Sequence, residues 1–275
     1  MPLGLGSLAT LTVAGPSPSV ELAPSSGVVS SNVMGGTTGP GAFDFEVVPK
    51  RVRHAPGCYD VVALAHGRPR DVARRAGYTR LVAQQLQRFA EGQFVVVMRV
   101  AGRDAVVGTS TTMRTARPPS AEPLPWRQVV GDDGIPRHDP AGSWLYGVEI
   151  AVHPGFQRRG VGSALYRARL EVVEDLDLEG WYAGGMLMGY HRYADVLSPR
   201  AYAEQVIDGR LEDPTVSMQM RRGLEPAGII EAYCPEPKAG DCAVLLVWRP
   251  RPLARRRARR CRSARSPDMT RHGRR

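Results

Sequence analysis

The sequence has few lysines and no long apolar run. The first shortage concerns its coding composition, and the second excludes a membrane-spanning helix. Only two of its 37 basic residues are lysines, Lys50 and Lys238, a preference that we attribute to codon composition. No apolar run approaches the roughly 20 residues that a membrane helix needs. No basic segment precedes the weakly apolar N-terminus, so we expect no secretory signal and no membrane partner.

Cysteine is scarce as well, and its spacing excludes a disulfide framework or a zinc site. The four cysteines, Cys58, Cys234, Cys242 and Cys261, show no C-x-x-C pattern. Cys234 and Cys242 could face each other across a hairpin, but free thiols are the simpler expectation. We therefore expect a cytoplasmic protein in a reducing compartment, without a bound metal.

The positive net charge of +10 belongs to one end of the chain. Residues 249–275 contain twelve arginines and a single acidic residue, Asp268, and carry +11, which leaves −1 on residues 1–248. The basic balance therefore describes a tail and does not indicate a nucleic-acid-binding domain. Contact of this tail with nucleic acid would be non-specific and would weaken steeply as salt rises.

Composition divides the 275 residues into three parts. Residues 1–41 are rich in glycine, serine, proline and threonine without periodicity, so we expect disorder there, and Met34 is an alternative start. Residues 42–249 carry the periodic apolar patterns of one folded domain with an insertion at 186–214. Residues 250–275 form the arginine-rich tail, which cannot bury enough surface to offset the entropy of ordering.

Apolar periodicity predicts the elements of the folded part. Strands are expected over 42–53, 93–100, 105–115, 144–153, 180–185, 225–232 and 243–248, and helices over 71–91, 160–176, 199–208 and 215–222. Ser198, Pro199 and Gly209 predict the two ends of the helix within the insertion. The order predicts an α/β (α+β) fold, with a mixed central sheet of about seven strands and helices on both faces.

The most informative segment is the strand, loop and helix at residues 145–169. A period-two alternation ends at Pro154, a Gly-x-Gly loop follows at Gly160 and Gly162, and helical spacing of apolar residues begins at Val161. A helix that opens from such a loop presents unpaired N–H groups and its positive dipole end to one point. The spacing predicts a phosphate or pyrophosphate site, although glycines in such turns are more often there for geometry alone.

This loop resembles the coenzyme-binding signature of the GCN5-related N-acetyltransferases (GNAT family). Gln157-Arg158-Arg159-Gly160-Val161-Gly162 fills every defining position of the pattern Gln/Arg-x-x-Gly-x-Gly/Ala after a valine-rich strand. The element order over residues 43–248 also agrees with the GNAT fold. Residues 91–94, 138–140, 145–149 and 189–195 resemble a branch that is sometimes fused to a nitrilase-like carbon–nitrogen hydrolase. Too few residues follow Trp248 to form that hydrolase, so we expect none in this chain.

The resemblance implies that acetyl-CoA is the co-substrate and that its acetyl group moves to a primary amine by direct attack. The pyrophosphate would bind backbone N–H groups of residues 158–163, and the pantetheine arm would lie along the fourth strand, where family members separate it from the fifth. Gly184 and Gly185 fit a close backbone approach there. The expected coenzyme-binding residues are Ile150, Ala151, Val152, Gln157, Arg158, Arg159, Gly160, Val161, Gly162 and Ser163.

The catalytic residues are less fully specified. Glu149 is the candidate base, because many family members use an acid on this strand, although an exposed salt bridge would also explain it. Relatives commonly carry a tyrosine at the position of Gln219 as proton donor to the coenzyme thiolate. A side-chain amide cannot donate that proton, so Tyr190 or Tyr193 would replace the tyrosine or no acid is used. Packing, with each hydroxyl bonded to a local partner, is the simpler explanation of both tyrosines. His191 is a candidate for substrate binding, or a surface residue.

Three functions stay open. An N-acetyltransferase acting on a small-molecule or protein amine comes first, and a homodimer is compatible with it. A non-catalytic acyl-CoA-binding module comes second, since Gln219 replaces the usual tyrosine. A nucleic-acid-associated protein held by its basic tail comes third. Slow release of CoA with every amine would favour the second function. Tight, salt-sensitive DNA binding by the intact domain would favour the third.

Truncation after Arg249 tests the division between domain and tail. Because the predicted sheet is complete at Trp248, removal of residues 250–275 should leave turnover and thermal stability nearly unchanged. It should also abolish any retention on DNA at low salt. Acetyl-transfer assays, thermal unfolding and DNA-affinity chromatography measure the three properties. A truncated protein that loses acetyl transfer would instead place the arginines at the coenzyme or the substrate.

Overall fold

The structure, a computed structural model, describes residues 44–100 and 102–250. The predictions for residues 1–41, for Cys261 and for the tail beyond residue 250 lie outside these ranges. The other three cysteines are free thiols. Within the same ranges, no helix combines the length and apolar character required to cross a membrane.

Seven strands form one mixed sheet, which confirms the predicted fold class, in the order β1-β2-β3-β4-β5-β7-β6. The strands are β1 (Glu46–Pro49), β2 (Gln93–Val100), β3 (Arg103–Thr115), β4 (Trp144–Val152), β5 (Gly180–Met186), β6 (Glu225–Ile230) and β7 (Ala243–Trp248). Neighbouring strands run antiparallel except β4 and β5, which are parallel. A parallel pair needs a crossover connection, and α4 (Val161–Asp175) provides it.

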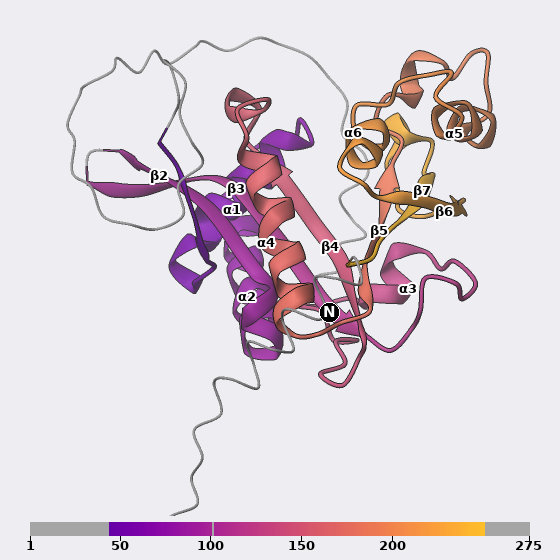
Figure 1. Cartoon of the computed structure of the whole chain (residues 1–275). Coiled ribbons are helices and arrows are strands. Elements are labelled where there is room, and N and C mark those ends of the chain that lie inside the picture. Colours follow the sequence, from indigo (N-terminus) through magenta and orange to yellow (C-terminus); the bar gives the residue numbers. More distant parts are fainter. Residues whose placement is uncertain (1–43, 101, 251–275) are drawn as a thin grey trace, which may run out of the picture.

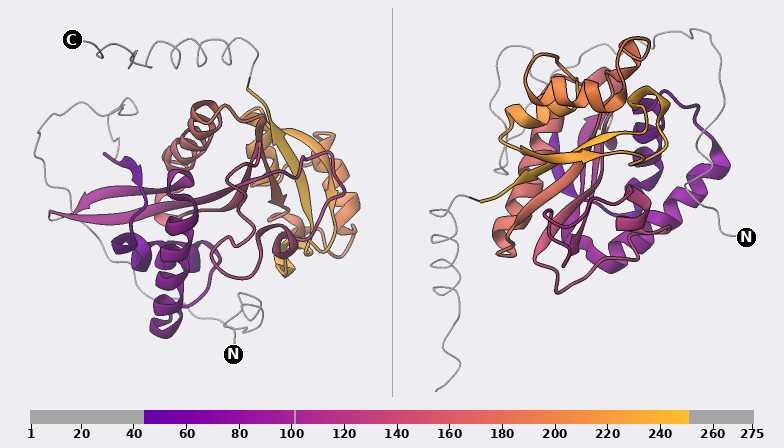
Figure 2. Two further views of the ribbon diagram at one scale, coloured as in Figure 1. Left: turned by 90° about the horizontal axis from the view of Figure 1, so that it is seen from below. Right: turned by 90° about the vertical axis from the view of Figure 1, so that its right-hand side faces the viewer.

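Helices cover both faces of the sheet (Figure 1). One face, called here the α1 face, packs against α1 (Ala55–Ala65), and α2 (Val72–Phe89) packs in turn on α1. The opposite α4 face carries α4 and, beside β5, the short helix α6 (Val216–Arg221). Helix α3 (Trp126–Val130) lies in the β3–β4 connection, and α5 (Pro199–Ile207) lies beyond α6 at one end of the sheet (Figure 2).

Helix α1 is an element that the sequence patterns did not predict. Pro56 followed by Gly57 is typical of a turn, but the structure places Pro56 in the first turn of the helix, where its missing N–H costs nothing. A β carbon on Gly57 would lie 2.8 Å from a methyl carbon of Val106 on β3. The Pro-Gly pair therefore begins a helix and lets it approach the sheet closely.

The insertion is an ordered part of the domain. Its helix α5 begins as predicted, with the Ser198 side chain as the N-cap and Pro199 as the first residue. Asp213, with 1% of its surface exposed, closes the insertion. Its carboxylate accepts hydrogen bonds from the backbone N–H groups of Gly189 and Val216, at 2.8 and 2.9 Å. This buried carboxylate ties the two ends of the insertion together.

Residues 91–94 and 138–140, two of the segments that resemble the hydrolase-fused branch of the family, both pack around Phe89. The Gln93 side-chain amide, fully buried, donates hydrogen bonds of 2.8 Å to the carbonyl oxygens of Phe89 and Thr112. His138 stacks on Phe89 with ring centroids 4.7 Å apart. Gly92 is enclosed between Phe89 and Thr112, so closely that a β carbon would overlap both side chains. These residues fix the start of β2 against β3.

Two glycine-to-alanine substitutions test this packing. Gly92→Ala should destabilise the protein by about 1–3 kcal/mol, because the new methyl group overlaps Phe89 and Thr112. At Gly77 in α2, the nearest atom to a new β carbon is the end of Arg80 at 3.9 Å. Gly77→Ala should therefore stabilise the protein by about 0.5–1 kcal/mol. Urea unfolding measures both; equal effects would show that packing around Gly92 does not limit stability.

Candidate active site

The predicted phosphate-binding loop joins β4 to α4. Arg158 and Gly160 both have left-handed backbones, with φ of 60° and 88°. Gly160 is the N-cap of α4, and its carbonyl accepts the first intrahelical hydrogen bond from the Ala164 N–H at 3.0 Å. The N–H groups of residues 161–163 therefore have no partner inside the helix. Together with the positive end of the helix dipole, they give this turn the geometry that suits an anion, and the predicted phosphate binding there stays a prediction.

Three arginines lie around this turn. Arg158 and Arg159 are exposed in the loop. Arg222, directly after α6, donates a hydrogen bond of 2.7 Å to the Ser163 hydroxyl in the first turn of α4. Sequence reasoning named the first two and missed Arg222, because no local pattern shows that the end of α6 meets the start of α4. An anion at this turn would meet positive charge from both elements.

Strands β4 and β5 pair only over residues 144–146 and 180–182. Beyond this point β4 continues to Val152 in contact with β3, and β5 continues to Met186 in contact with β7. The facing edges of the two strands are therefore left without a partner strand beyond Tyr146 and Tyr182. The structure thus shows the separation that the family resemblance implies, and the predicted residues 150–152 lie along it.

A bulge in β4 decides which side chains face which helices. The register with β3 shifts so that Thr111 lies opposite Glu149 and Thr112 opposite Gly147, which makes Val148 the extra residue. Glu149 consequently points to the α1 face, where its Oε1 accepts a hydrogen bond of 2.9 Å from the Tyr78 hydroxyl. Ile150 packs on the α4 face, in the apolar cluster around α4. The predicted opposite orientation of Glu149 and Ile150 is confirmed.

The surroundings of Glu149 suit a proton acceptor. In the ranges that the structure describes, no lysine or arginine side chain lies within 4.0 Å of the Glu149 carboxylate, so it is not held in an ion pair. Burial, and then the charge of Glu149, raise the pKa of Tyr78 well above its ordinary value, so Tyr78 stays protonated and donates. Burial lowers the pKa of the nearby Lys50, whose amine donates to Thr111 at 2.9 Å.

A buried arginine, Arg169, holds the bulge from the α4 face, and no sequence pattern pointed to it. It is 2% exposed, and its guanidinium donates to the carbonyl oxygens of Glu149 and Thr111. Burial lowers its pKa to about 10, so it is still a cation at neutral pH. On the other face, the indole N–H of Trp126 donates to the Val148 carbonyl at 2.9 Å. Both faces therefore hold the backbone of the bulge in place.

Gly184 and Gly185 do allow a close approach to β5, but side chains of this chain make it. A β carbon on Gly184 would overlap the Tyr233 ring, and one on Gly185 would overlap the side-chain oxygen of Gln219. Gln219 is 4% exposed, and its Nε2 donates a hydrogen bond of 2.8 Å to the hydroxyl of Tyr166. The position where relatives commonly carry a tyrosine is therefore in direct contact with a tyrosine from α4.

The candidate residues of the insertion lie in a short 3-10 turn, Tyr190–Arg192, and directly after it. The Tyr190 hydroxyl donates to the Leu197 carbonyl at 3.1 Å, inside the insertion. Tyr193 packs on Tyr202 with ring centroids 5.2 Å apart. His191 is exposed, with its Nδ1 3.1 Å from the Met188 carbonyl oxygen. These contacts show packing, and the catalytic or substrate-binding roles of the three residues stay predictions.

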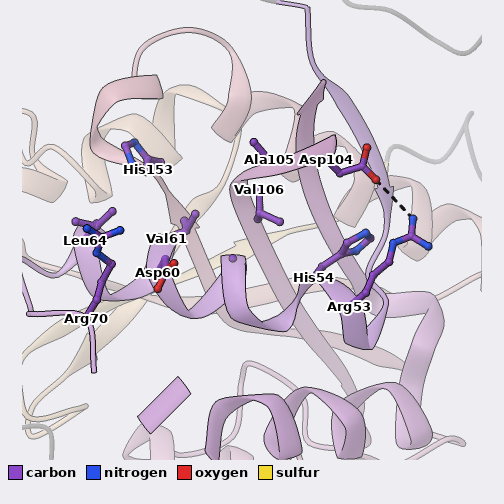
Figure 3. Close-up of a pocket in the computed structure, with 11 residues that line it drawn as sticks. Arg53, His54, Asp60, Val61, Leu64, Arg70, Asp104, Ala105, Val106 and His153 are labelled. Carbon is purple, nitrogen blue, oxygen red and sulfur yellow. Dashed lines mark ion pairs between the residues drawn. The ribbon is translucent and has the colours of Figure 1, made fainter. Parts of the chain in front are cut away.

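A separate cavity of about 330 Å³ lies between α1 and the start of β3 (Figure 3). His54, Asp60 and Arg70 line it, together with His153 from the end of β4. An ion pair between Arg53 and Asp104, 3.6 Å apart, lies at one end. No predicted site residue lines this cavity, so the candidate active site is the open edge between β4 and β5 and not this pocket.

Comparison with known proteins agrees with this geometry. Residues 129–185 match the family described as "Acetyltransferase (GNAT) family". The matched stretch contains β4, the glycine loop, α4 and most of β5. It therefore covers the elements that form the candidate site.

Two curated relatives come from Bacillus subtilis (strain 168). The chain is 29% identical to "Uncharacterized N-acetyltransferase YkwB" over 168 residues. This aligned stretch covers 61% of this chain and 73% of that protein. The chain is 30% identical over 164 residues to "Probable hydrolase YhcX", which covers 59% of this chain but 31% of that protein. The chain thus spans less than a third of a relative named as a hydrolase, which supports the predicted resemblance to the fused branch.

Solved structures share the fold. "GphF GNAT-like decarboxylase in complex with isobutyryl-CoA" superposes with a TM-score of 0.58 and 22% identity, over 74% of this chain and 98% of that chain. The "loading GNATL domain of CurA from Lyngbya majuscula" also has a TM-score of 0.58, with 16% identity, over 75% of this chain and 98% of that chain. At these identities the two structures show the fold alone.

A charge placed in the glycine loop tests coenzyme binding. Gly162→Asp should lower the affinity for acetyl-CoA by ~10²-fold, because a carboxylate would enter the phosphate-binding turn. Folding should survive, since the nearest atom to a β carbon there is a Val152 methyl carbon at 3.7 Å. Gly77→Asp adds the same charge on α2 and should bind like the wild type. Calorimetric titration with acetyl-CoA measures both affinities. Unchanged affinity in folded Gly162→Asp protein would show that this loop does not bind the coenzyme phosphates.

Proposed function

Because the chain belongs to the GNAT acetyltransferase family, we propose that it moves an acetyl group from acetyl-CoA to a primary amine carried by a small molecule or a protein. The observation that carries the proposal is the arrangement along β4. The turn that fits an anion lies at the end of β4. Along the second half of β4, the edge that faces β5 has no partner strand among the described residues, and the Glu149 carboxylate lies beside that edge on the α1 face.

The chain has groups that fit each part of acetyl-CoA. The first-turn N–H groups of α4, with Arg158, Arg159 and Arg222, fit the pyrophosphate. Among the described residues, no strand pairs with residues 147–152 on the side of β5, and this edge fits the amides of the pantetheine arm, which can add to it like a strand. GphF, which shares the fold, is named as a complex with isobutyryl-CoA, and this supports an acyl-CoA ligand.

The chemistry requires one proton to leave the amine as its nitrogen bonds to the acyl carbon. Glu149 is the group on the α1 face that can accept this proton, directly or through a water molecule. Its hydrogen bond from Tyr78 orients the carboxylate. Arg169 and Trp126 hold the bulge that presents Glu149, so the base is supported from both faces of the sheet.

A panel of amines separates this proposal from a non-catalytic acyl-CoA-binding module. Aliphatic amines, aromatic amines, aminoglycosides and peptide N-termini are incubated with acetyl-CoA, and the released CoA thiol is measured. Turnover with one class supports the proposal and identifies the acceptor. Binding of acetyl-CoA without thiol release above background for any amine would overturn it in favour of the binding module.

Glu149→Gln tests the proton acceptor. The substitution should lower kcat by ~10²–10⁴ and remove the acidic limb of the pH profile, while the affinity for acetyl-CoA stays nearly unchanged. Glu171→Gln, at an exposed position on α4, is the matched control and should behave like the wild type. Wild-type kcat across the pH range in Glu149→Gln would place the base elsewhere, with His191 as the next candidate.

A further inference from the structure

A tyrosine, a tryptophan and a glutamine side chain meet on the α4 face where β4 and β5 separate. Tyr166 from α4 and Trp181 from β5 pack edge to face, with ring centroids 5.5 Å apart. Gln219 from α6 donates to the Tyr166 hydroxyl at 2.8 Å. All three are buried, with exposures of 4%, 0% and 4% in that order.

Two atoms of this cluster have no hydrogen-bond partner among the residues that the structure describes. Within the described part of the chain, the Trp181 indole N–H and the Gln219 side-chain oxygen are buried and unpaired. Each such atom costs free energy unless a ligand satisfies it. The indole nitrogen lies 2.9 Å from where a β carbon of Gly147 would be, and Gly147 is the first residue of β4 beyond the pairing with β5. The unpaired atoms therefore border the separation of the strands.

The Tyr166 hydroxyl is placed to give away its proton. It accepts a hydrogen bond from Gln219, and among residues 44–100 and 102–250 no acceptor for its own hydrogen is found. Burial raises the pKa of Tyr166, so it is protonated at neutral pH. Arg169, Gln219 and Arg222 act in the opposite direction. The guanidinium carbons of Arg169 and Arg222 lie 5.8 and 5.4 Å from the ring centroid, close enough to stabilise a phenolate.

We infer that Tyr166, oriented by Gln219, donates the proton to the sulfur atom of the departing coenzyme. This inference rests on the proposed acetyl transfer. The amine nitrogen bonds to the acyl carbon, the carbon–sulfur bond breaks, and its electron pair stays on sulfur. Glu149 takes one proton from the amine, and Tyr166 gives one to the sulfur. An amide and a thiol result, and the phenolate and the carboxylic acid return to their starting states by exchange with solvent.

The sheet itself separates the two proton transfers. Glu149 points to the α1 face, whereas Tyr166 and Gln219 lie on the α4 face. A thioester between the separated strands would meet the base on one side and the proton donor on the other. The sheet between them therefore prevents direct proton transfer from Tyr166 to Glu149. Gln219, which is unable to donate to a thiolate as a tyrosine does, thus acts as the positioning residue for a tyrosine from another helix.

Binding measurements test Tyr166 without turnover. A hydroxyl that donates to sulfur stabilises the thiolate form of free CoA and cannot do so for acetyl-CoA, which has no ionisable thiol. In the wild type, the ratio of CoA to acetyl-CoA affinity should therefore rise about tenfold as pH increases through the thiol pKa. In Tyr166→Phe this rise should disappear. Calorimetric titration of both ligands at several pH values gives the ratio, with acetyl-CoA as the internal reference.

Kinetics provide the second measurement. Tyr166→Phe should lower kcat by roughly 10²-fold, the low end for acid catalysis because a thiolate leaves readily, and should remove the basic limb of the pH profile. Gln219→Met keeps the size but removes the donor to Tyr166, and should move the basic limb to higher pH. Tyr202→Phe, which removes another buried hydroxyl, bound to Asp213 at 3.3 Å, is the matched control and should change neither property.

The outcomes separate this inference from the proposed function. If Tyr166→Phe keeps the pH-dependent affinity ratio of the wild type, Tyr166 only packs, and the inference is overturned whether or not kcat falls. If the wild type binds CoA with this pH dependence but acetylates no amine, the proposed function fails while the contact between Tyr166 and sulfur stands. If the wild type binds neither ligand, both fail.

Discussion

The separation of β4 from β5 is the constraint on which the candidate site depends. Two parallel strands pair over three residues each and then diverge, although both continue in the same sheet through their outer neighbours. Backbone groups along the inner edges are left without strand partners, and such groups need hydrogen bonds from elsewhere. Because the strands are parallel, their connection crosses one face, and α4 begins beside the end of β4. The strand separation and the turn that we propose for anion binding therefore occur together.

The bulge in β4 turns this edge into a two-sided site. One extra residue, Val148, lets Glu149 face α1 and α2 while Ile150 faces α4. A bulge leaves carbonyl groups outside the regular ladder, and here Trp126 and Arg169 bind them from opposite faces. The buried guanidinium has carbonyl and hydroxyl partners and faces two aromatic rings, those of Tyr166 and Trp181. Among the described residues, no carboxylate lies within 4.0 Å of this guanidinium, so its charge stays next to the candidate site without a direct ion pair.

Local sequence signals predicted most of the elements because each signal acts within a few residues. Asp71 caps α2 and Ser198 caps α5, and both helices begin where these side chains accept a backbone N–H. The same reasoning missed α1, since Pro56-Gly57 has the composition of a turn. Packing decided that segment: the glycine lets the helix lie directly on Val106, a contact that no local pattern records. Tertiary burial overrode local preference there.

The sequence by itself determined the seven-stranded fold and the glycine turn before α4 that we propose as the phosphate site, because alternation, helical spacing and the Gly-x-Gly loop are contiguous in the chain. Only the tertiary structure decided which distant side chains complete the site. Arg222 binds Ser163 across 59 positions, Gln219 binds Tyr166 across 53, and Tyr78 binds Glu149 across 71. A hydrogen bond between such residues leaves no period in the sequence, since it forms only after the sheet has brought α2, β4, α4 and α6 together.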